Sequence, residues 1–243
     1  MKDLHIHSIF SFDGKTKIES YIDFAKQNFF DAIGFSEHDE IIDSMTMFNN
    51  YLNTISKNDK KNNINILSGI ELDIKNISNL SSFIYDSLDF ILCSYHLICK
   101  TPTEYYINFY NLLLDEKTFS LFDVLAHIDF PLRYSLFANS FFDQFSKDSF
   151  QYIEKILLLL IENNKSLEIN SEIFFQDNKD VATKFWQKII EIYKKNKGYL
   201  FTFGSDSHNL DDFILSISLR KEILNLLGLD ESDFVSYKKH KVF

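Results

Sequence analysis

Short apolar segments alternate with helical stretches along the whole chain. Near-continuous apolar runs are expected of parallel strands that are covered on both faces. Stretches between them carry the 3.6-residue period of an amphipathic helix. Repeated strand–helix alternation within one domain indicates either an α/β barrel or a doubly wound sheet. The seven candidate strands, each with polar residues at or next to its end, are Leu4–His7, Ala32–His38, Ile64–Ile74, Phe90–His96, Val124–Phe130, Ser166–Glu172 and Tyr199–His208.

Three apolar stripes mark helices between these strands. The first consists of Ile18, Tyr21, Ile22, Ala25 and Phe29. Thr16 lies three residues before Glu19, a spacing that predicts a capping box at the start of this helix. Residues 181–193 and 213–227 carry the other two stripes, and residues 49–65 are expected to form a helix followed by an exposed loop. No compositional break or internal repeat divides the 243 residues, a length that suits one larger α/β domain spanning residues 1–243.

The composition excludes several classes of protein. With 6 Gly and 2 Pro, the chain has too few turn-forming residues for an all-β protein with many tight turns. Its 25 basic and 35 acidic residues give a net charge of −10, and only Arg133 and Arg220 are arginines. An acidic chain so poor in arginine is not expected to bind nucleic acid.

The chain is expected to act in the cytoplasm, away from membranes. The first predicted strand begins within the first few residues and leaves no room for a signal peptide. The longest apolar run, Ile156–Ile161, is much shorter than a membrane span. Cys93 and Cys99 lack the spacing of a metal finger or a disulfide framework and are interpreted as reduced thiols. The sequence leaves the oligomeric state open.

Six of the seven histidines lie at or next to the C-terminal end of a predicted strand: His5, His7, His38, His96, His127 and His208. Acidic residues share these strand ends: Glu71, Asp73, Asp129, Glu168 and Asp206. A single histidine at such a position is usually structural, but six histidines spread over five strands indicate a shared function. All strand ends of a parallel barrel converge on one face, whereas the outer strands of an open sheet lie too far apart. The pattern therefore favours a closed barrel, and His240, in the basic tail, is expected to be solvated.

Imidazoles and carboxylates together indicate bound metal ions. Both groups bind divalent Zn, Mn and Fe, and one ion takes three or four protein ligands. Nine or so candidate ligands therefore imply two or three ions. His5 and His7 point to the same face of a strand because they are two residues apart, and Glu71 is the best placed carboxylate to bridge two ions. Clustered ions activate a water and clamp a phosphoryl group, so the residues predict a multinuclear metallohydrolase, with phosphate esters as the first substrate class to test.

The chain resembles the PHP (polymerase and histidinol phosphatase) superfamily. The motifs that carry the resemblance occur in the family's order and extend from the first strand to the last. They are Asp3-Leu4-His5-Ile6-His7-Ser8, Ser11-Phe12-Asp13-Gly14, Gly34-Phe35-Ser36-Glu37-His38, Gly69-Ile70-Glu71, Ser94-Tyr95-His96, Ala126-His127-Ile128-Asp129, Glu168-Ile169-Asn170 and Gly204-Ser205-Asp206-Ser207-His208. The resemblance implies a distorted (βα)7 TIM-like barrel of seven parallel strands.

Two stretches look more like the histidinol-phosphatase branch of this superfamily. Residues 127–134 resemble that branch's His-Pro-Asp-Leu-Ile-Lys-Arg-Tyr stretch, and residues 90–98 resemble the strand ahead of its fourth-motif histidine. The resemblance implies hydrolysis of L-histidinol phosphate, a small-molecule phosphate ester, to L-histidinol and phosphate in histidine biosynthesis. A hydroxide bridging two metal ions would attack the phosphorus.

The resemblance also assigns metal ligands. It implies a first ion held by His5, His7, Glu71 and Asp206, and a second held by Glu71, His96 and His127. It implies a third held by Asp13, His38 and His208, with Asp13 at a point where some family members have histidine. An oxygen ligand in that position weakens or re-tunes the third site.

Further residues are expected to act on the substrate. Arg133 suits bidentate binding of a phosphate. Catalytic roles are implied for Arg133, Asp206 and Glu71, with Asp206 or a metal-bound water supplying the leaving-group proton. Substrate contacts are expected from Arg133, Glu168, Asn170 and Asp129, while Glu37 and Asp129 are candidates to orient ligand histidines.

Other functions fit the same residues less well. A phosphatase of the same superfamily that acts on phosphotyrosine or another small phosphomonoester would share the metal motifs. An accessory module of a replicative polymerase is disfavoured because the chain carries no polymerase body. Metal storage is disfavoured because it does not require an ordered site with an arginine beside it.

Overall fold

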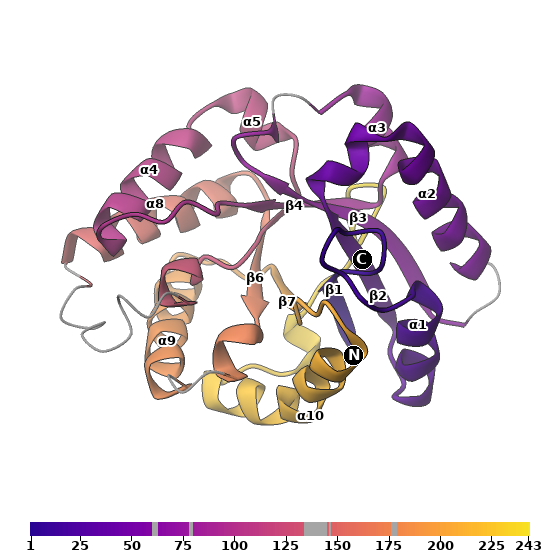
Figure 1. Cartoon of the computed structure of the whole chain (residues 1–243). Helices are drawn as coiled ribbons and strands as arrows, with labels where there is room; N and C mark the ends of the chain where they lie inside the picture. The colour runs from indigo at the N-terminus through magenta and orange to yellow at the C-terminus, as the bar shows by residue number, and fades with distance from the viewer. Residues whose placement is uncertain (60–62, 78–79, 134–144, 146, 176–178) are drawn as a thin grey trace.

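The main sheet of this protein is a nearly closed barrel, as the sequence predicts (Figure 1). The computed structural model describes residues 1–59, 63–77, 80–133, 145, 147–175 and 179–243. Seven parallel strands follow one another in chain order: β1 (Lys2–Ile6), β2 (Ala32–His38), β3 (Asn65–Asp73), β4 (Phe90–Ser94), β5 (Val124–Leu125), β6 (Ser166–Asn170) and β7 (Phe201–Gly204). Just beyond β7, the Asp206 amide donates to the His5 carbonyl (2.8 Å) and the His7 amide to the Ser207 carbonyl (2.9 Å). These hydrogen bonds join the last strand to the first.

Helices surround the sheet on its outer side (Figure 1). In the described residues they are α1 (Ile18–Gln27), α2 (Met45–Asp59), α3 (Ser82–Ser87), α4 (Pro102–Leu113), α5 (Glu116–Ser120), α8 (Lys147–Glu162), α9 (Lys179–Lys195) and α10 (Leu210–Leu227). In this described part of the chain, three short 3₁₀ turns follow strands and a fourth follows α10: η1 (Asp39–Asp43), η3 (Phe130–Arg133), η4 (Glu172–Phe175) and η5 (Glu231–Asp233). None of the described helices is long and apolar enough to cross a membrane. Cys93 is buried, Cys99 is half-buried, and both are free thiols.

The helical stripes are confirmed with two corrections. Helix α9 buries six residues of its predicted stripe, and α10 covers the third stripe. The first stripe is one residue too long, because α1 ends before Phe29, which has a φ of 59° and is 87% exposed. The predicted capping box is wrong, since Lys17 is the N-cap and makes no side-chain hydrogen bond to the helix. Thr16 Oγ1 instead accepts from the Leu210 amide (3.0 Å), which ties α1 to the start of α10.

Apolar side chains fill both sides of the sheet. The larger cluster lies between strands and helices. A second cluster comes mainly from β1 to β5 and fills the barrel: Leu4, Ala32, Leu67, Phe90, Leu92, Val124, Ala126 and Tyr237. The Phe90 ring reaches across to Gly34 and Gly69, where an added Cβ would approach it to 2.7 and 2.5 Å. Only glycine leaves room for the ring at these two positions, so the chain can fill the barrel below the polar strand ends.

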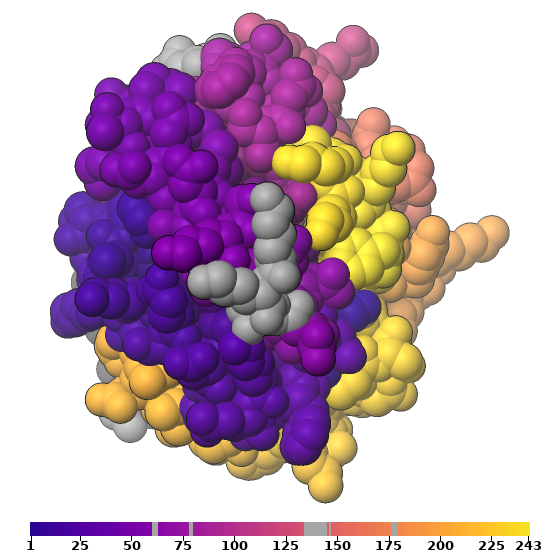
Figure 2. Space-filling model, turned by 90° about the vertical axis from the view of Figure 1, so that its right-hand side faces the viewer, coloured from indigo at the N-terminus to yellow at the C-terminus, as the bar shows by residue number. Residues whose placement is uncertain are grey.

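The C-terminal segment packs across the end of the barrel where the strands begin. It forms the hairpin β8 (Tyr237–Lys238) and β9 (Lys241–Val242), which belongs to the yellow C-terminal part of the chain in Figure 2. His240 Nδ1 lies 2.7 Å from Asp123 Oδ2, and His240 Nε2 lies 2.8 Å from the Tyr85 carbonyl. Its ring also stacks on the Tyr85 ring at 3.9 Å. The expectation of a solvated His240 is therefore wrong, because positive φ angles at Lys239 and His240 turn the chain back onto the barrel.

Candidate metal centre

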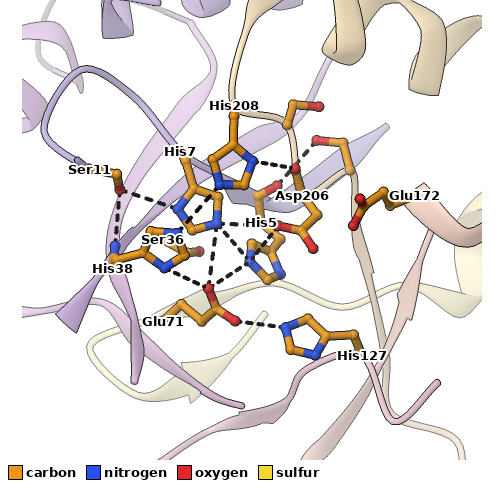
Figure 3. A network of polar contacts seen from close by, with 12 residues as sticks. His5, His7, Ser11, Ser36, His38, Glu71, His127, Glu172, Asp206 and His208 are labelled. Atoms are coloured by element: carbon orange, nitrogen blue, oxygen red, sulfur yellow. Dashed lines mark hydrogen bonds and ion pairs between the residues drawn. The ribbon is translucent and has the colours of Figure 1, made fainter. Parts of the chain in front are cut away.

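The C-terminal ends of the strands bring the predicted ligands onto one face of the barrel. Strand β1 carries His5 and is followed by His7, β2 ends at His38, and β3 carries Glu71. His96 and His127 each lie two residues beyond a strand, while Asp206 and His208 follow β7. The register of β2 and β3 pairs His38 with Glu71. In Figure 3 the imidazoles of His5, His7 and His38 turn toward the Glu71 carboxylate, with His127 on its other side.

Four atoms converge at the first predicted position. His5 Nε2 and His7 Nε2 are 3.0 Å apart, and each lies 3.4 Å from Asp206 Oδ1. Each of these nitrogens is also 3.6 Å from Glu71 Oε2. Two imidazoles and two carboxylates therefore face a common point, and all four side chains are almost completely buried.

The other oxygen of Glu71 faces a second group. Glu71 Oε1 lies 2.7 Å from His127 Nε2 and 3.3 Å from His96 Nε2. His127 is buried, whereas the His96 side chain is 37% exposed. Glu71 thus offers one oxygen to each of two neighbouring groups of histidines, which is the geometry of a bridging carboxylate.

A third group lies on the side of β2. Asp13 is 3.5 Å from His38 Nε2 and 3.3 Å from His208 Nε2, and these two nitrogens are 3.4 Å apart. His7 lies close enough to His38 and His208 for the three to share one ion. All nine residues predicted as metal ligands therefore lie in one continuous cluster, with Asp13 at its more exposed edge.

Hydrogen bonds on the far side of two imidazoles fix which nitrogen faces the cluster. His5 Nδ1 lies 2.7 Å from Glu168 Oε1, and a carboxylate can only accept there, so Nδ1 carries the proton. His7 Nδ1 lies 3.3 Å from the Ser11 hydroxyl, which itself donates to Glu37 (2.7 Å). Both Nε2 atoms consequently direct a lone pair into the cluster, as carboxylate-oriented histidines do at metal sites. Ser11 belongs to a quoted motif, but nothing in the sequence assigned it this role.

Glu168 also shapes the backbone of the site. Its Oε2 accepts the His127 amide (2.8 Å) and is 3.2 Å from Asn170 Nδ2. His127 and Asp206 have positive φ angles of 25° and 56°, a region that costs a non-glycine residue about 1–2 kcal/mol. The amide that Glu168 accepts comes from one of these strained residues, so the carboxylate helps to hold His127 in place.

The electrostatics of the cluster fit divalent cations. Burial lowers the pKa of His7 to about 4, so its imidazole is neutral at pH 7. Burial also lowers the pKa of His5, but Glu168, Asp206 and Glu71 outweigh it and hold that pKa well above the usual range. The two ring nitrogens lie 3.0 Å apart among carboxylates, close enough to share one cation. Imidazole nitrogen with carboxylate oxygen is the donor set of Zn, Mn or Fe, so the residues fit such ions.

Arg133 is buried beside the cluster, where it pairs with two carboxylates. Its Nη1 lies 2.8 Å from Asp206 Oδ2 and also pairs with Glu172, the first residue of η4. Its Nε and Nη2 have no hydrogen-bond partner among the described residues. Burial lowers the pKa of Arg133, but Asp206, Glu172 and Asp129 outweigh it, so the guanidinium stays charged. The hydrophobic pattern predicts Glu172 at the end of a strand, and nothing in the sequence indicates its pairing with Arg133.

The remaining predicted residues lie beneath or beside the cluster. Asn170 and Asp129 have no exposed surface, and both oxygens of Asp129 lack a hydrogen-bond partner in the described residues. Burial raises the pKa of Asp129 to about 7, against the lowering effect of Arg133. Asp73 Oδ2 accepts the His96 amide (3.3 Å). Tyr134, which belongs to the stretch resembling histidinol phosphatases, falls outside the described residues.

Comparison with known proteins identifies the class. A barrel with histidines and carboxylates at its strand ends is the arrangement implied by the PHP resemblance, and the PHP domain family matches residues 3–172. The chain belongs to the PHP domain family. A probable histidinol-phosphatase of Thermotoga maritima is 30% identical over 98% of this chain and 99% of its own length. A histidinol-phosphatase of Lactococcus lactis is 26% identical over 94% of this chain and 92% of its own.

A solved structure has the same fold over the whole chain. It is the histidinol phosphate phosphatase of Lactococcus lactis, in a complex with zinc, L-histidinol and phosphate. The two structures match with a TM-score of 0.78 over 100% of this chain and 98% of that chain, at 22% sequence identity. This likeness confirms the seven-stranded barrel.

Proposed function

We propose that this protein is a metal-dependent phosphomonoesterase that hydrolyses L-histidinol phosphate to L-histidinol and phosphate in histidine biosynthesis. The observation that carries the proposal is the buried Arg133 guanidinium beside the cluster of histidines and carboxylates, seven of which are grouped closely enough to hold metal ions. A cationic fork next to clustered divalent ions fits a phosphate dianion. The choice of histidinol phosphate rests on the curated relatives, which match almost the entire chain.

The proposed ligand sets follow the three groups of the cluster. We assign the first ion to His5, His7, Glu71 and Asp206, the second to Glu71, His96 and His127, and the third to Asp13, His38 and His208. Zinc, manganese and iron all suit these donors, and zinc is bound in the Lactococcus lactis structure. Such ions, when bound, activate water and neutralise charge on the phosphate.

The residues of the chain bind and orient the phosphate. Nη1 of Arg133, which faces Asp206 and the partly exposed Glu172, can donate to non-bridging oxygens, where charge in phosphoryl transfer is concentrated. Asp206 holds the guanidinium through Nη1 (2.8 Å) and is itself held by Asn170 (3.2 Å). His5 and Arg133 outweigh burial and keep the pKa of Asp206 well below its usual range. An ionised Asp206 has no proton to donate, so we assign it to ligation and to positioning Arg133.

The proposal revises the substrate contacts expected of three buried residues. Glu168, Asn170 and Asp129 were expected to contact substrate, but none has more than a trace of exposed surface. Their burial favours a supporting role, with Glu168 orienting His5 and Asn170 orienting Asp206. We further propose that residues 1–243 form a single PHP-type barrel domain and that the protein acts in the cytoplasm, where both cysteines stay reduced.

The experiment is a substrate comparison with the metal-loaded protein. We expect kcat/KM for L-histidinol phosphate to exceed that for phosphotyrosine and for nucleoside monophosphates by at least about tenfold, the effect of one additional well-placed interaction. A higher kcat/KM for phosphotyrosine or another phosphomonoester would replace the histidinol-phosphatase proposal with the alternative phosphatase function. Hydrolysis of no phosphate ester by protein with full metal content would reject both.

A further inference from the structure

Glu172 has an unusual position among the carboxylates of the metal centre. It begins η4, two residues after β6, and its backbone amide donates to Asn170 Oδ1 (3.0 Å). Its side chain is 41% exposed, whereas those of Asp206 and Glu71 are 7% and 2% exposed. In Figure 3 it approaches Asp206 from the side away from the histidines. Glu172 therefore lies at the solvent side of the centre.

The other acidic side chains around the centre either contact other residues or, like Asp129, have no exposed surface. Glu71, Asp206 and Asp13 face the ligand histidines, and Glu168 holds His5 and the His127 amide. Among the described residues, no ligand histidine lies within ion-pair distance of Glu172. Its charged partner is Arg133 Nη1. Because its side chain is 41% exposed, the Glu172 carboxylate can exchange Arg133 for another cation at the solvent side of the centre.

The chemistry of the proposed substrate supplies such a cation. Histidinol phosphate carries an ammonium group on the carbon next to the phosphate-bearing carbon, four bonds from phosphorus. Single bonds of about 1.5 Å place this nitrogen within about 5 Å of the phosphorus. A phosphate bound to Arg133 would hold the ammonium within reach of a carboxylate that touches the same guanidinium.

We propose that Glu172 selects the substrate by binding its ammonium group. This inference rests on the proposed function and assigns a specificity residue to it. The incoming phosphate takes the place of the Glu172 carboxylate on Arg133, and the carboxylate turns to the ammonium. A phosphate ester without a nearby ammonium gains no such partner, and Glu172 then competes with its phosphate for Arg133. The residue thus favours an aminoalkyl phosphate and disfavours other phosphomonoesters.

The test compares two substrates that differ by one amino group. L-Histidinol phosphate and its desamino analogue, 3-(imidazol-4-yl)propyl phosphate, are hydrolysed by wild-type, Glu172→Gln and Glu172→Asp proteins with equal metal content. A hydrogen bond between charged groups contributes about 10- to 100-fold to binding. We expect Glu172→Gln to lower the ratio of the two kcat/KM values by that factor, mainly through KM, and Glu172→Asp to retain part of the ratio. Titration calorimetry should show weaker L-histidinol binding to Glu172→Gln.

Glu40→Gln is the matched control. Glu40 lies at the rim in η1, where it accepts the Phe12 amide (3.2 Å), and it makes no contact with Arg133. We expect its substrate ratio to equal that of the wild type. A parallel loss on both substrates in Glu172→Gln would show that Glu172 only positions Arg133 and would overturn the inference, as would an unchanged ratio. If wild-type protein hydrolyses other phosphate esters but not histidinol phosphate, the proposed function fails first and the inference falls with it.

Discussion

Replacing Glu71 with glutamine separates the two halves of the proposed centre. Glu71 Oε1 lies 2.7 Å from His127 Nε2, and Oε2 lies 3.1 Å from His38 Nδ1 and 3.6 Å from His5 Nε2. Glutamine keeps the size of the side chain but offers one oxygen and an amide nitrogen that cannot ligate an ion. Whichever way the amide turns, one of the two groups of histidines loses its shared ligand.

The expected loss is large because the bridge serves two ions. Altering a residue that only supports a metal ligand already lowers affinity about 10- to 100-fold. Removing a shared ligand and its charge should lower metal affinity by more than this factor. We therefore expect the Glu71→Gln protein to bind at least one ion fewer per chain than the wild type. Phosphate stabilisation by clustered ions is worth several kcal/mol. A loss of about 4 kcal/mol corresponds to a fall in kcat of about 10³-fold.

The assay combines metal content with turnover. Plasma mass spectrometry after gel filtration counts the ions per chain, and phosphate release from L-histidinol phosphate gives kcat. Glu191→Gln makes the same chemical change on the exposed face of α9, where the side chain is 65% exposed, and should match the wild type in both measurements. Full metal content together with full turnover in Glu71→Gln would refute the bridging role.

Three further predictions concern the arginine, a glycine and the C-terminal hairpin. Arg133→Lys should lower kcat/KM about 10²-fold because lysine cannot bind phosphate with a planar fork. A kcat/KM equal to that of the wild type would exclude phosphate binding by Arg133. Gly204→Ala should lower the free energy of unfolding by about 1–3 kcal/mol in urea titrations, since its Cβ would lie 2.2 Å from Glu168 Oε1; unchanged stability would contradict the packing. His240→Ala should cost about 1 kcal/mol at pH 6. Asp123 outweighs burial and raises the pKa of His240 above its ordinary 6.5, so this contribution is complete below pH 6.5 and lost as the pH rises through the folded-state pKa. A stability difference from wild type that grows with pH would contradict it.

The barrel and the convergence of its ligands were predictable from particular residues. Strand direction alone collects His5, His38, Glu71 and Asp206 on one face, because the C-terminal ends of parallel strands meet there. The fixed two-residue period of a strand also places His5 and His7 together, and their Nε2 atoms lie 3.0 Å apart.

The ends of the strands were not predictable from the same pattern. The segment expected as a strand over residues 124–130 pairs only through Val124–Leu125. His127 then adopts a φ of 25° to aim its ring at Glu71, and residues 130–133 form η3. Burial continues through both regions, so hydrophobic runs cannot distinguish a strand from the buried turn that follows it.

Two contacts depend on tertiary structure that no local pattern encodes. The pairing of Glu172 with Arg133 joins residues 39 positions apart, from turns that follow different strands. His240 reaches Asp123 only because the hairpin folds back over the barrel. The sequence indicates a strand end for Glu172 and a basic tail for His240, but the partners of both residues come from distant parts of the chain.

The central claim is that the clustered histidines and carboxylates form a metal centre that hydrolyses L-histidinol phosphate. The most direct test is phosphate release from L-histidinol phosphate by protein stripped with a chelator and then reloaded with zinc or manganese. The account predicts no turnover without metal and recovery of turnover as two or three ions are restored per chain. Equal phosphate release before and after reloading, or none from fully loaded protein, would contradict it.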